Sequence, residues 1–397
     1  MRVSTRSAYL NGLAAIQQLQ ASLDRTQRQI SSGRRILTPS DDPIAASRSL
    51  ELREALSRLQ QFGRNSTVVT NRLSQEESAL AAVNNVLQRV RELALQGSNA
   101  TQSNESRKFI AIEMREHLGN LEQLANQKDG NGGYLFAGNL ENTQPVSRMG
   151  STFTYNGDQG QRFIQIGEGR QVADSDPGSA VFFQIRSGNG EFATAAAAAN
   201  TGTGVIGASS VIDPTLYDQD EYTIRFADPD NYDVFDSSGG LVASGAYVSG
   251  DTIAFRGIEF TLAGEPAAAD EFIASPSPFQ DLFSMVQNLA NALETSSNSP
   301  ESRAAMANQV NAGIMNMDQA LGHILDVRTQ VGSRLAAIED QVDSNGSFAL
   351  AMQTALAEIE DLDYAEAISR LSAETTTLEA AQKSFVITQR LSLFNLL

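Results

Sequence analysis

The residues of this chain that could carry out chemistry are few, and they stand apart from one another. Cysteine is absent from the 397 residues, which excludes a thiolate metal site and a cysteine nucleophile. The two histidines, His117 and His323, each lie alone on a helical pattern without an HExxH motif, so we interpret them as partly exposed helical residues. No grouping of serine, histidine and aspartate supports nucleophilic catalysis. The sequence therefore predicts a protein that is not an enzyme, with no cofactor and no metal site.

Three local motifs contain glycine or acidic residues that could bind a ligand, but local structure explains each of them better. The stretch 130–138 is rich in glycine, yet it lacks the lysine of a phosphate-binding loop and follows a helix, so we interpret it as a turn. Asp41 and Asp42 precede Pro43, the order expected where Asp42 caps a helix that begins at Pro43. The Asp-Pro-Asp-Asn sequence at 228–231 is typical of a turn and lacks the EF-hand pattern of a Ca²⁺ site.

Charge is distributed unevenly along the chain. The formal net charge is −18, which argues against nucleic acid or an anionic membrane as the main partner. Residues 141–275 hold 19 acidic residues against 6 arginines and no lysine. Residues 1–35 carry six arginines against one aspartate, whereas residues 356–397 carry seven acidic and three basic residues. The two ends are therefore oppositely charged, as suits segments that pack against each other.

Neither a membrane span nor a cleavable signal is visible in the sequence. No run of about 18 apolar residues is present. The first thirty residues contain several glutamines and arginines and no apolar core of a signal peptide. We therefore expect no membrane insertion, and either a cytoplasmic location or export without a cleaved signal peptide.

The N-terminal segment is predicted to be an amphipathic helix over Thr5–Ser32. Its apolar stripe consists of Tyr9, Leu13, Ile16, Leu23 and Ile30. Gln20 and Gln27 complete the 4-3 spacing, so we expect a weakened hydrophobic seam. Gly33 follows, as is typical of the end of a helix.

Further long helices are predicted on both sides of the middle of the chain. One helix is expected from Pro43 to Gln96, with the seam Val69, Leu73, Glu76, Leu80, Val83, Leu87 and Val90. Another is expected after the break at 99–104. Helical spacing returns at Phe279 and continues from the start signal at Ser299–Glu301, and we expect Asn345–Gly346 to interrupt it. The last helix carries Leu356, Ile359, Ile368, Leu371, Leu378 and Phe385.

The middle of the chain is predicted to be β-rich. Asn156–Gly157 between Thr152–Tyr155 and Arg162–Ile166 indicates a hairpin. Short strands are also expected at Tyr222–Phe226, Asp233–Phe235 and Thr252–Phe255. The stretch Thr194–Gly207, rich in alanine, glycine and threonine, is predicted to be a flexible loop.

These patterns predict an α+β protein with a long, coiled-coil-like helical bundle built from paired N- and C-terminal segments. Long helices need partners, because packing supplies most of their stability. We expect residues 1–42 and 362–397 to form terminal helices that make an inner assembly domain. Residues 43–140 and 276–361 are expected to form a helical rod. Residues 141–275 would be an inserted, acidic, β-rich domain that faces solvent, and the turn and helix cap between the first two parts would be Pro39, Asp41, Asp42 and Pro43.

The terminal helices are the candidate assembly surface. The alternative is ordinary packing within one monomer. We prefer assembly because the seam holds glutamines and the chain ends on a contiguous apolar tail. Besides the apolar stripe of the first helix, the predicted interface comprises Ile368, Leu371, Leu378, Phe385, Leu391, Leu393, Phe394, Leu396 and Leu397.

Five short motifs give the chain a resemblance to the flagellin superfamily. They are Met1–Thr5, Pro39–Pro43, Gly133–Gly138, Asp361–Ala367 and Leu391–Phe394. Each motif is weak, but their order at both ends of one chain is specific. Within the superfamily the combination is most similar to the FlgL family of hook-associated, hook–filament junction proteins. The resemblance covers nearly all of residues 1–140 and 276–397.

The resemblance implies a structural subunit of the bacterial flagellum that joins hook to filament by helical self-assembly through its terminal helices. It implies a homo-oligomer in a ring or short helical zone, with a FlgK-like junction protein and flagellin as neighbours. It also implies type III export to an extracellular location and a FlgN-like chaperone at the C-terminal segment. The rivals are flagellin itself, a multimeric adhesin-like protein that binds a ligand through its β domain, and an enzyme of unrecognised type, which the missing nucleophile–base sets disfavour.

Overall fold

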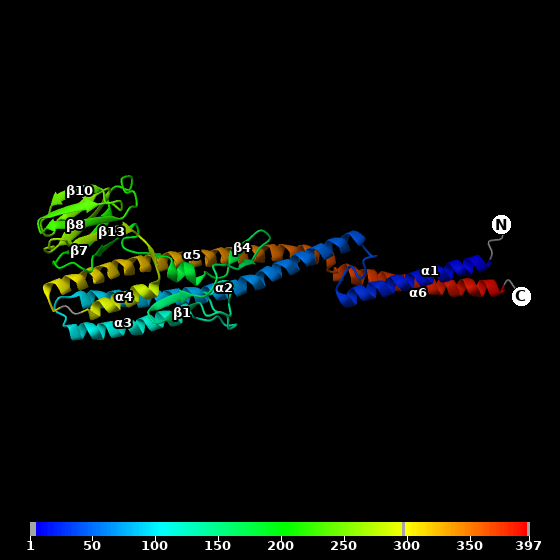
Figure 1. Cartoon of the computed structure of the whole chain (residues 1–397). Coiled ribbons are helices and arrows are strands. Elements are labelled where there is room, and N and C mark those ends of the chain that lie inside the picture. The colour runs from blue at the N-terminus through cyan, green and yellow to red at the C-terminus, as the bar shows by residue number, and fades with distance from the viewer. Residues whose placement is uncertain (1–4, 296–297, 395–397) are drawn as a thin grey trace. The chain divides into compact units, whose positions relative to one another are not determined.

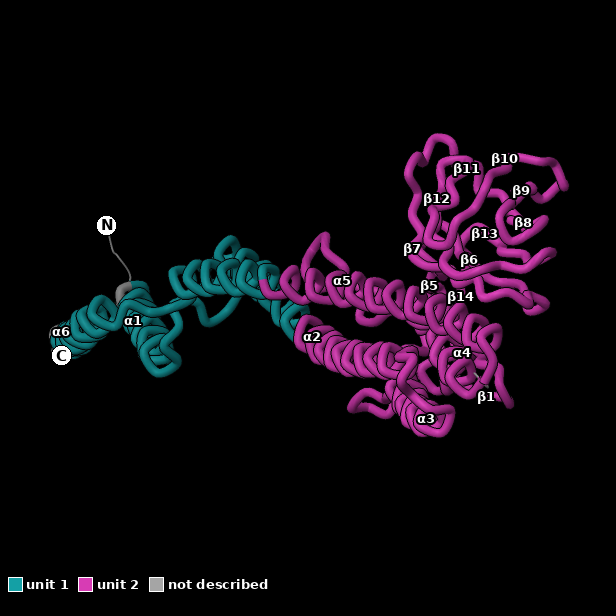
Figure 2. The backbone as a smooth tube through the Cα atoms, turned by 90° about the vertical axis from the view of Figure 1, so that its left-hand side faces the viewer, with its two compact units in different colours: residues 1–64, 340–397 teal, residues 65–339 magenta. Residues whose placement is uncertain are grey.

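The computed structural model describes residues 5–295 and 298–394, apart from the side chains of residues 5, 6, 8 and 388–394. The chain divides into two compact units, residues 1–64 with 340–397 and residues 65–339, shown in teal and magenta in Figure 2. We name them unit 1 and unit 2. The helical segments at both ends of the chain flank a β-rich middle (Figure 1), so the predicted α+β fold with paired terminal helices is confirmed.

Helices make up both ends of the chain. They are α1 (Thr5–Ser32), α2 (Pro43–Ser98), α3 (Asn104–Ala125), α4 (Leu282–Glu294), α5 (Pro300–Glu360) and α6 (Tyr364–Phe394). Helix α1 ends as predicted at Gly33, which has a φ of 70° and donates its N–H to Gln29 O at 2.9 Å. Ser103 caps α3 by accepting the N–H of Ser106 at 3.1 Å.

Two helical predictions are wrong. Asn345–Gly346 does not interrupt α5, because one mid-helix glycine costs only about 1 kcal/mol relative to alanine, and the Gln341 amide supports the turn by donating to Asn345 Oδ1 at 3.0 Å. Phe279 is not helical: it lies in a short strand, since Asp281 caps α4 by accepting the N–H of Ser284 at 2.7 Å.

Fourteen strands are found among the described residues, all paired antiparallel. The first five are β1 (Val146–Met149), β2 (Thr152–Tyr155), β3 (Phe163–Gln165), β4 (Gln171–Ala173) and β5 (Ile185–Arg186), with a π-helical turn η1 (Ser179–Phe183) before β5. Then come β6 (Phe192–Ala196), β7 (Val205–Val211), β8 (Tyr222–Asp228), β9 (Asn231–Phe235) and β10 (Leu241–Ala246). The last are β11 (Thr252–Phe255), β12 (Ile258–Ala263), β13 (Glu271–Pro276) and β14 (Phe279–Gln280).

The strands form one five-stranded sheet, one three-stranded sheet and three strand pairs. The five-stranded order is β10-β9-β8-β13-β6, and the three-stranded order is β11-β12-β7. The pairs are β1-β2, β3-β4 and β14-β5. The predicted strands at 222–226, 233–235 and 252–255 are therefore confirmed as β8, β9 and β11.

Two predictions for the middle of the chain are wrong. Asn156–Gly157 forms no hairpin: β2 pairs back with β1, and Asn156 N–H extends that pairing by donating to Pro145 O at 2.7 Å. The predicted loop Thr194–Gly207 contains part of β6 and β7. Its small residues reflect close neighbours and not flexibility, because a Cβ on Gly207 would lie 2.3 Å from Thr261 Oγ1 on the adjacent strand.

Two separate hydrophobic cores lie in unit 2. The larger one combines α2, α3, α4 and α5 with β1–β5 and η1, and includes Leu80, Leu118 and Phe182. The second lies among strands β6 to β13, and includes Phe226 and Phe260. The domain boundaries that we expect from the sequence stay a prediction, and the two cores show only which side chains pack together.

Candidate assembly surface

Helices α1 and α6 pack against each other in unit 1, as the colours at the two chain ends show (Figure 1). The α1 positions that are wholly or half buried recur at 4-3 spacing, and so do those of α6. On α1 they include Leu13, Ile16, Leu19, Leu23, Thr26 and Ile30. On α6 they include Ala367, Leu371, Glu374, Leu378, Ala381 and Phe385. This spacing is the coiled-coil pattern, so each helix covers the seam of the other.

The prediction that Gln20 and Gln27 weaken the seam is wrong. Both glutamines are exposed, and Leu19 and Thr26 take the places between Ile16 and Ile30. The error arises because both frames keep a 4-3 rhythm, and only contact with a partner selects one of them. The α1 seam is therefore more apolar than the predicted stripe.

An aromatic contact lies at one end of the seam. The rings of Tyr9 and Phe385 are 5.3 Å apart between centroids, and Tyr9 stays 44% exposed. Gly12 makes this contact possible, because a Cβ at that position would come within 2.9 Å of the Phe385 ring. The structure thus brings together two predicted interface residues from opposite ends of the chain.

One polar pair is built into the seam. Ser22 Oγ donates to Glu374 Oε1 at 2.5 Å, while Glu374 Oε2 is buried without a hydrogen-bond partner among the described residues. A polar residue in an otherwise apolar seam costs stability and restricts the register of the two helices.

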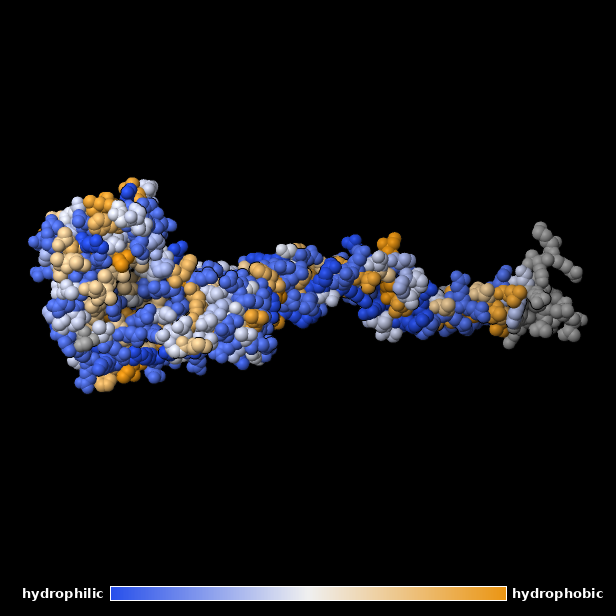
Figure 3. All heavy atoms as spheres, in the orientation of Figure 1, coloured by the Kyte–Doolittle hydropathy of each residue, from blue (hydrophilic) through white to orange (hydrophobic). Residues whose placement is uncertain are grey.

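Ile368 does not lie in the seam. It is 56% exposed on α6, and Val386 on the same helix is 47% exposed. These two residues are eighteen positions apart in sequence, which is about five turns of an α-helix, so they face the same side of it, with the exposed polar residues Ser372, Thr375 and Glu379 between them. We name Ile368 and Val386 the outer α6 line. Figure 3 shows apolar patches among the hydrophilic areas of the α1 and α6 surface, so this helix pair alone leaves apolar area in contact with water.

Backbone hydrogen bonds join the segment after α1 to the end of α5 and to the turn between α5 and α6. Leu362 N–H donates to Gly33 O at 3.0 Å, and Arg35 N–H donates to Glu360 O at 2.7 Å. The Arg35 guanidinium also donates to Ile359 O, at 2.9 Å from Nη2. These bonds join residues that are more than three hundred positions apart in sequence, and they hold the residues that follow α1 next to those that precede α6.

The turn before α2 contains the predicted cap residues. Asp42 Oδ1 accepts the N–H of Ala45 at 3.0 Å, and Pro43 is the first residue of α2. Asp41 Oδ2 accepts the N–H groups of Leu37 and Thr38, and the hydrogen bond from Thr38 lowers the pKa of Asp41 below its ordinary value.

Pro39 lines a cavity of about 190 Å³ near this turn. Arg53 and Glu360, which also line the cavity, form an ion pair at 2.5 Å.

The structure describes only some of the C-terminal residues of the predicted interface. Leu391, Leu393 and Phe394 belong to α6, but their side chains are outside the description. Leu396 and Leu397 lie outside the described residues altogether.

The histidines and the acidic turn that were considered as candidate catalytic or ligand-binding residues make contacts within the fold. His323 Nε2 lies 2.8 Å from Ala180 O, and His117 Nε2 lies 3.8 Å from a carboxylate oxygen of Glu113. Asp228 accepts the N–H of Asp230 at 2.9 Å in the turn between β8 and β9. Across the described residues, no group of three or more histidine and acidic side chains is placed to hold a metal ion, and no helix is long and apolar enough to cross a membrane.

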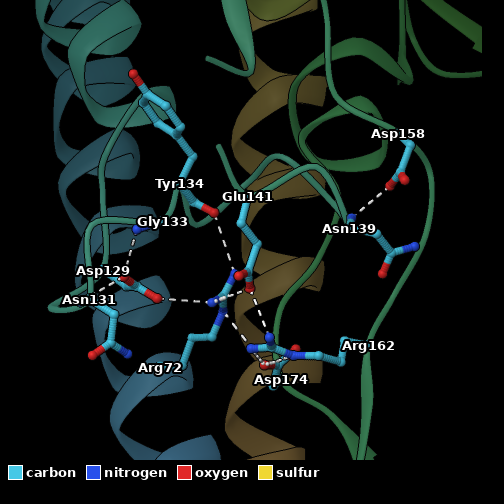
Figure 4. Close-up of polar contacts among 10 residues, drawn as sticks. All are labelled: Arg72, Asp129, Asn131, Gly133, Tyr134, Asn139, Glu141, Asp158, Arg162 and Asp174. Atoms are coloured by element: carbon cyan, nitrogen blue, oxygen red, sulfur yellow. Dashed lines mark hydrogen bonds and ion pairs between the residues drawn. The ribbon is translucent and has the colours of Figure 1, made fainter. Parts of the chain in front are cut away.

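The sequence reasoning missed a buried ionic network in unit 2. Its central residue is Arg72, whose guanidinium contacts Asp129 and Glu141 (Figure 4). Glu76 is a further buried member, with 0% exposure. A signal was present, because Glu76 occupies one of the regular seam positions of α2 among leucines and valines.

Comparison with known proteins places these features in a family. The model of the bacterial flagellin N-terminal helical region matches residues 3–141, and that of the C-terminal helical region matches residues 314–397. The flagellar hook-associated protein 3 of Escherichia coli strain K12 is 27% identical over 401 residues, which covers 100% of this chain and 99% of that protein.

Solved structures agree with the sequence comparison. The crystal structure of Xanthomonas campestris FlgL is 34% identical, with a TM-score of 0.73, over 77% of this chain and 99% of that chain. The flagellar junction protein FlgL from Legionella pneumophila is 32% identical, with a TM-score of 0.73, over 79% of this chain and 99% of that chain. These relatives are structural flagellar proteins, and the predicted resemblance is confirmed. The chain is therefore a structural component of the bacterial flagellum, and it belongs to the FlgL family of hook-associated junction proteins.

Proposed function

We propose that this chain joins hook to filament by self-assembly through α1 and α6, as a homo-oligomer in a ring or short helical zone. The observation that carries the proposal is the outer α6 line, Ile368 and Val386, which the α1–α6 pair leaves about half exposed. Two exposed apolar residues on one side of a long helix are points that a neighbouring subunit can cover. The predicted interface residues of the seam hold the two helices together, and the outer line makes the contact between subunits.

The opposite charges of the two terminal segments support a contact between neighbours. Among the described residues no ion pair joins α1 to α6. Arg28 pairs with Asp24 on its own helix at 2.9 Å, and Arg370 pairs with Glu366 on its own helix at 2.5 Å. The opposite net charges of the two terminal segments are thus not neutralised across the α1–α6 pair and can act between neighbouring subunits. Exposed ion pairs between subunits contribute little affinity, but they favour one orientation of approach.

The remaining parts of the proposal concern domains and partners. We assign residues 1–42 and 362–397 to the inner assembly domain, residues 43–140 and 276–361 to a helical rod, and residues 141–275 to a solvent-facing domain. A FlgK-like junction protein and flagellin would be the neighbours, and a FlgN-like chaperone would bind the C-terminal segment before export. We place the protein outside the cell and assign it no enzymatic activity. Export without a cleaved signal peptide stays a prediction.

The turn at Pro39, Asp41, Asp42 and Pro43 is assigned the role of orienting the terminal helices relative to the rod. The hydrogen bonds of Asp41 and Asp42 to nearby backbone N–H groups support this assignment, because they order both the turn and the first residues of α2.

The test is electron microscopy of cells that lack the gene, with the culture medium assayed for flagellin. Hooks without filaments, together with free flagellin in the medium, would support the junction role. Complementation with a FlgK gene should fail to restore filaments, which separates the two junction proteins. Hooks without filaments and no flagellin in the medium would mean that this chain is the main flagellin. Normal filaments would contradict the proposal and favour the adhesin-like alternative, whose test is ligand binding by the β-rich part.

A further inference from the structure

Charged side chains are buried in unit 2 at the place where α2 packs against the segment 126–176. Three of them are almost fully inaccessible to solvent: Arg72 is 5% exposed, and Glu76 and Asp174 are each 0% exposed. Burying charged or polar groups is costly unless each atom has a partner.

Arg72 uses both terminal nitrogens of its guanidinium. Nη1 donates to Asp129 Oδ2 at 2.9 Å and to Glu141 Oε1 at 2.8 Å, while Nη2 lies 3.4 Å from Tyr134 O (Figure 4). The third nitrogen, Nε, faces Asp174, with 3.7 Å between Nε and Asp174 Oδ2. That distance is too long for a hydrogen bond, so Nε–H has no partner among the described residues.

Asp174 and Glu76 are each satisfied on one oxygen only. Asp174 Oδ2 accepts from Arg162 Nε at 2.8 Å, and Asp174 Oδ1 is buried without a partner. Glu76 Oε1 accepts the N–H of Asp176 at 3.1 Å, and Glu76 Oε2 is buried without a partner. Leaving a buried donor or acceptor unsatisfied costs stability, and native proteins rarely contain three such atoms in one cluster.

Two of these residues, Arg72 and Asp174, face each other, and the third, Glu76, lies next to Arg72 along α2. Arg72 and Glu76 are one turn apart on α2, and so lie on the same face of that helix. Asp174 and Asp176 follow β4 two positions apart, and their contacts show that Asp174 faces Arg72 while Asp176 faces Glu76. A polar cavity of about 460 Å³, lined in part by Arg72, opens beside the cluster and offers a route from solvent.

We propose that Arg72, Glu76 and Asp174 together bind an internal water molecule. Water fits this set because it both accepts and donates: its oxygen accepts Arg72 Nε–H, and one of its hydrogens goes to Asp174 Oδ1. Glu76 completes the set as the neutral acid, whose Oε2–H donates to the water oxygen. A cation does not fit, because the N–H of Arg72 would point at it.

The buried position of Glu76 favours its neutral form. Burial, followed by the negative charge of Asp176, raises the pKa of Glu76 well above its ordinary value. Arg334 and Arg72 act in the opposite direction, but Arg334 is already held by Asp176, with 2.8 Å between Nη2 and Oδ1. The water would thus complete a hydrogen-bond network in which α2 and α5 both contact the segment that follows β4.

The water can be tested directly on the full-length wild-type protein. A cross-relaxation peak between bound water and Arg72 Nε–H is expected in NMR spectra recorded with selective water excitation. Absence of that peak, with the Arg72 Nε–H resonance itself visible, would overturn the proposal without the need for any variant.

Variants at Glu76 provide the second test. Relaxation dispersion of water should count one long-lived internal molecule fewer in Glu76→Met than in the wild type, and no change in Glu92→Gln, whose parent side chain is 65% exposed on the same helix. Glu76→Gln should keep the water but lose one infrared carbonyl band of a protonated carboxylic acid. An unchanged water count in folded Glu76→Met, or no band lost in Glu76→Gln, would contradict the proposed site.

Discussion

The outer α6 line provides the sharpest test of assembly. Replacing Ile368 and Val386 together by aspartate removes the apolar line without touching the seam, because the two side chains are 56% and 47% exposed. Fully burying such a side chain contributes about 1.5–3 kcal/mol, so covering the exposed half contributes about 1 kcal/mol for each residue. Two residues then contribute about 2 kcal/mol per subunit contact, or roughly a thirtyfold change in critical concentration.

Aspartate weakens the contact further, since its charge must also lose water at the interface. We therefore expect the critical concentration for polymerisation, measured by sedimentation, to rise a hundredfold or more. The free energy of unfolding of the monomer should change by less than about 0.5 kcal/mol, because surface substitutions away from special features do little. The matched control is Ile212→Asp in the β-rich region, where the parent side chain is 55% exposed and assembly should be unchanged.

Two results would refute this reasoning. Normal polymerisation of the double variant would mean that the outer α6 line is not the contact between subunits. A large loss of monomer stability would mean that the two residues belong to the core of unit 1, which would contradict their exposed positions on α6.

Three further predictions concern single positions. Phe385→Ala should lower the stability of unit 1 by about 2 kcal/mol in chemical denaturation, about half of the loss typical of a buried phenylalanine, because the ring is half buried against Tyr9; an unchanged midpoint would show that the seam does not hold α1 and α6 together. Asp42→Ala should cost about 1 kcal/mol through loss of the cap on Ala45 N–H, whereas Asp42→Asn should cost much less. The folded-state pKa of Glu76 is raised, so the stability that protonated Glu76 contributes is fully present below the unfolded-state pKa and is lost as pH rises through the raised folded-state pKa. Glu76→Gln should therefore gain stability relative to the wild type as pH increases. Equal pH profiles of the two proteins in urea unfolding would contradict this.

The helix ends show how much a short segment determines by itself. Gly33 ends α1 because its positive φ is readily available only to glycine, and Asp42 with Pro43 starts α2 because a carboxylate and a proline suit those two positions. Both signals act within a few residues, so no distant partner is needed to recognise them. The same is true of the turn at 228–231, where Asp228 bonds to the next residues of the chain.

The errors have a common cause. Thr194–Gly207 is predicted as a loop because its residues are small, but β13 and β12 come close enough to require small residues there. Asn156–Gly157 has the composition of a hairpin turn, but β2 pairs with the preceding strand β1, so the hairpin turn lies between Met149 and Thr152. In each case a neighbouring strand decides between two locally acceptable structures; β1 lies only two residues before β2, whereas β12 and β13 are distant in sequence from 194–207.

Some features of the assembly surface can likewise be predicted from local sequence, whereas others depend on packing. Periodicity and composition are properties of each segment alone, so the amino-acid sequence is enough to show that the two ends of this chain are amphipathic helices of opposite charge. The packed fold was needed to show that Leu19 and not Gln20 lies in the seam, that Ile368 faces outward, and that Arg72, Glu76 and Asp174 are buried. The physical reason is that burial depends on what another segment covers, and neither the 4-3 rhythm nor the residue type specifies that partner.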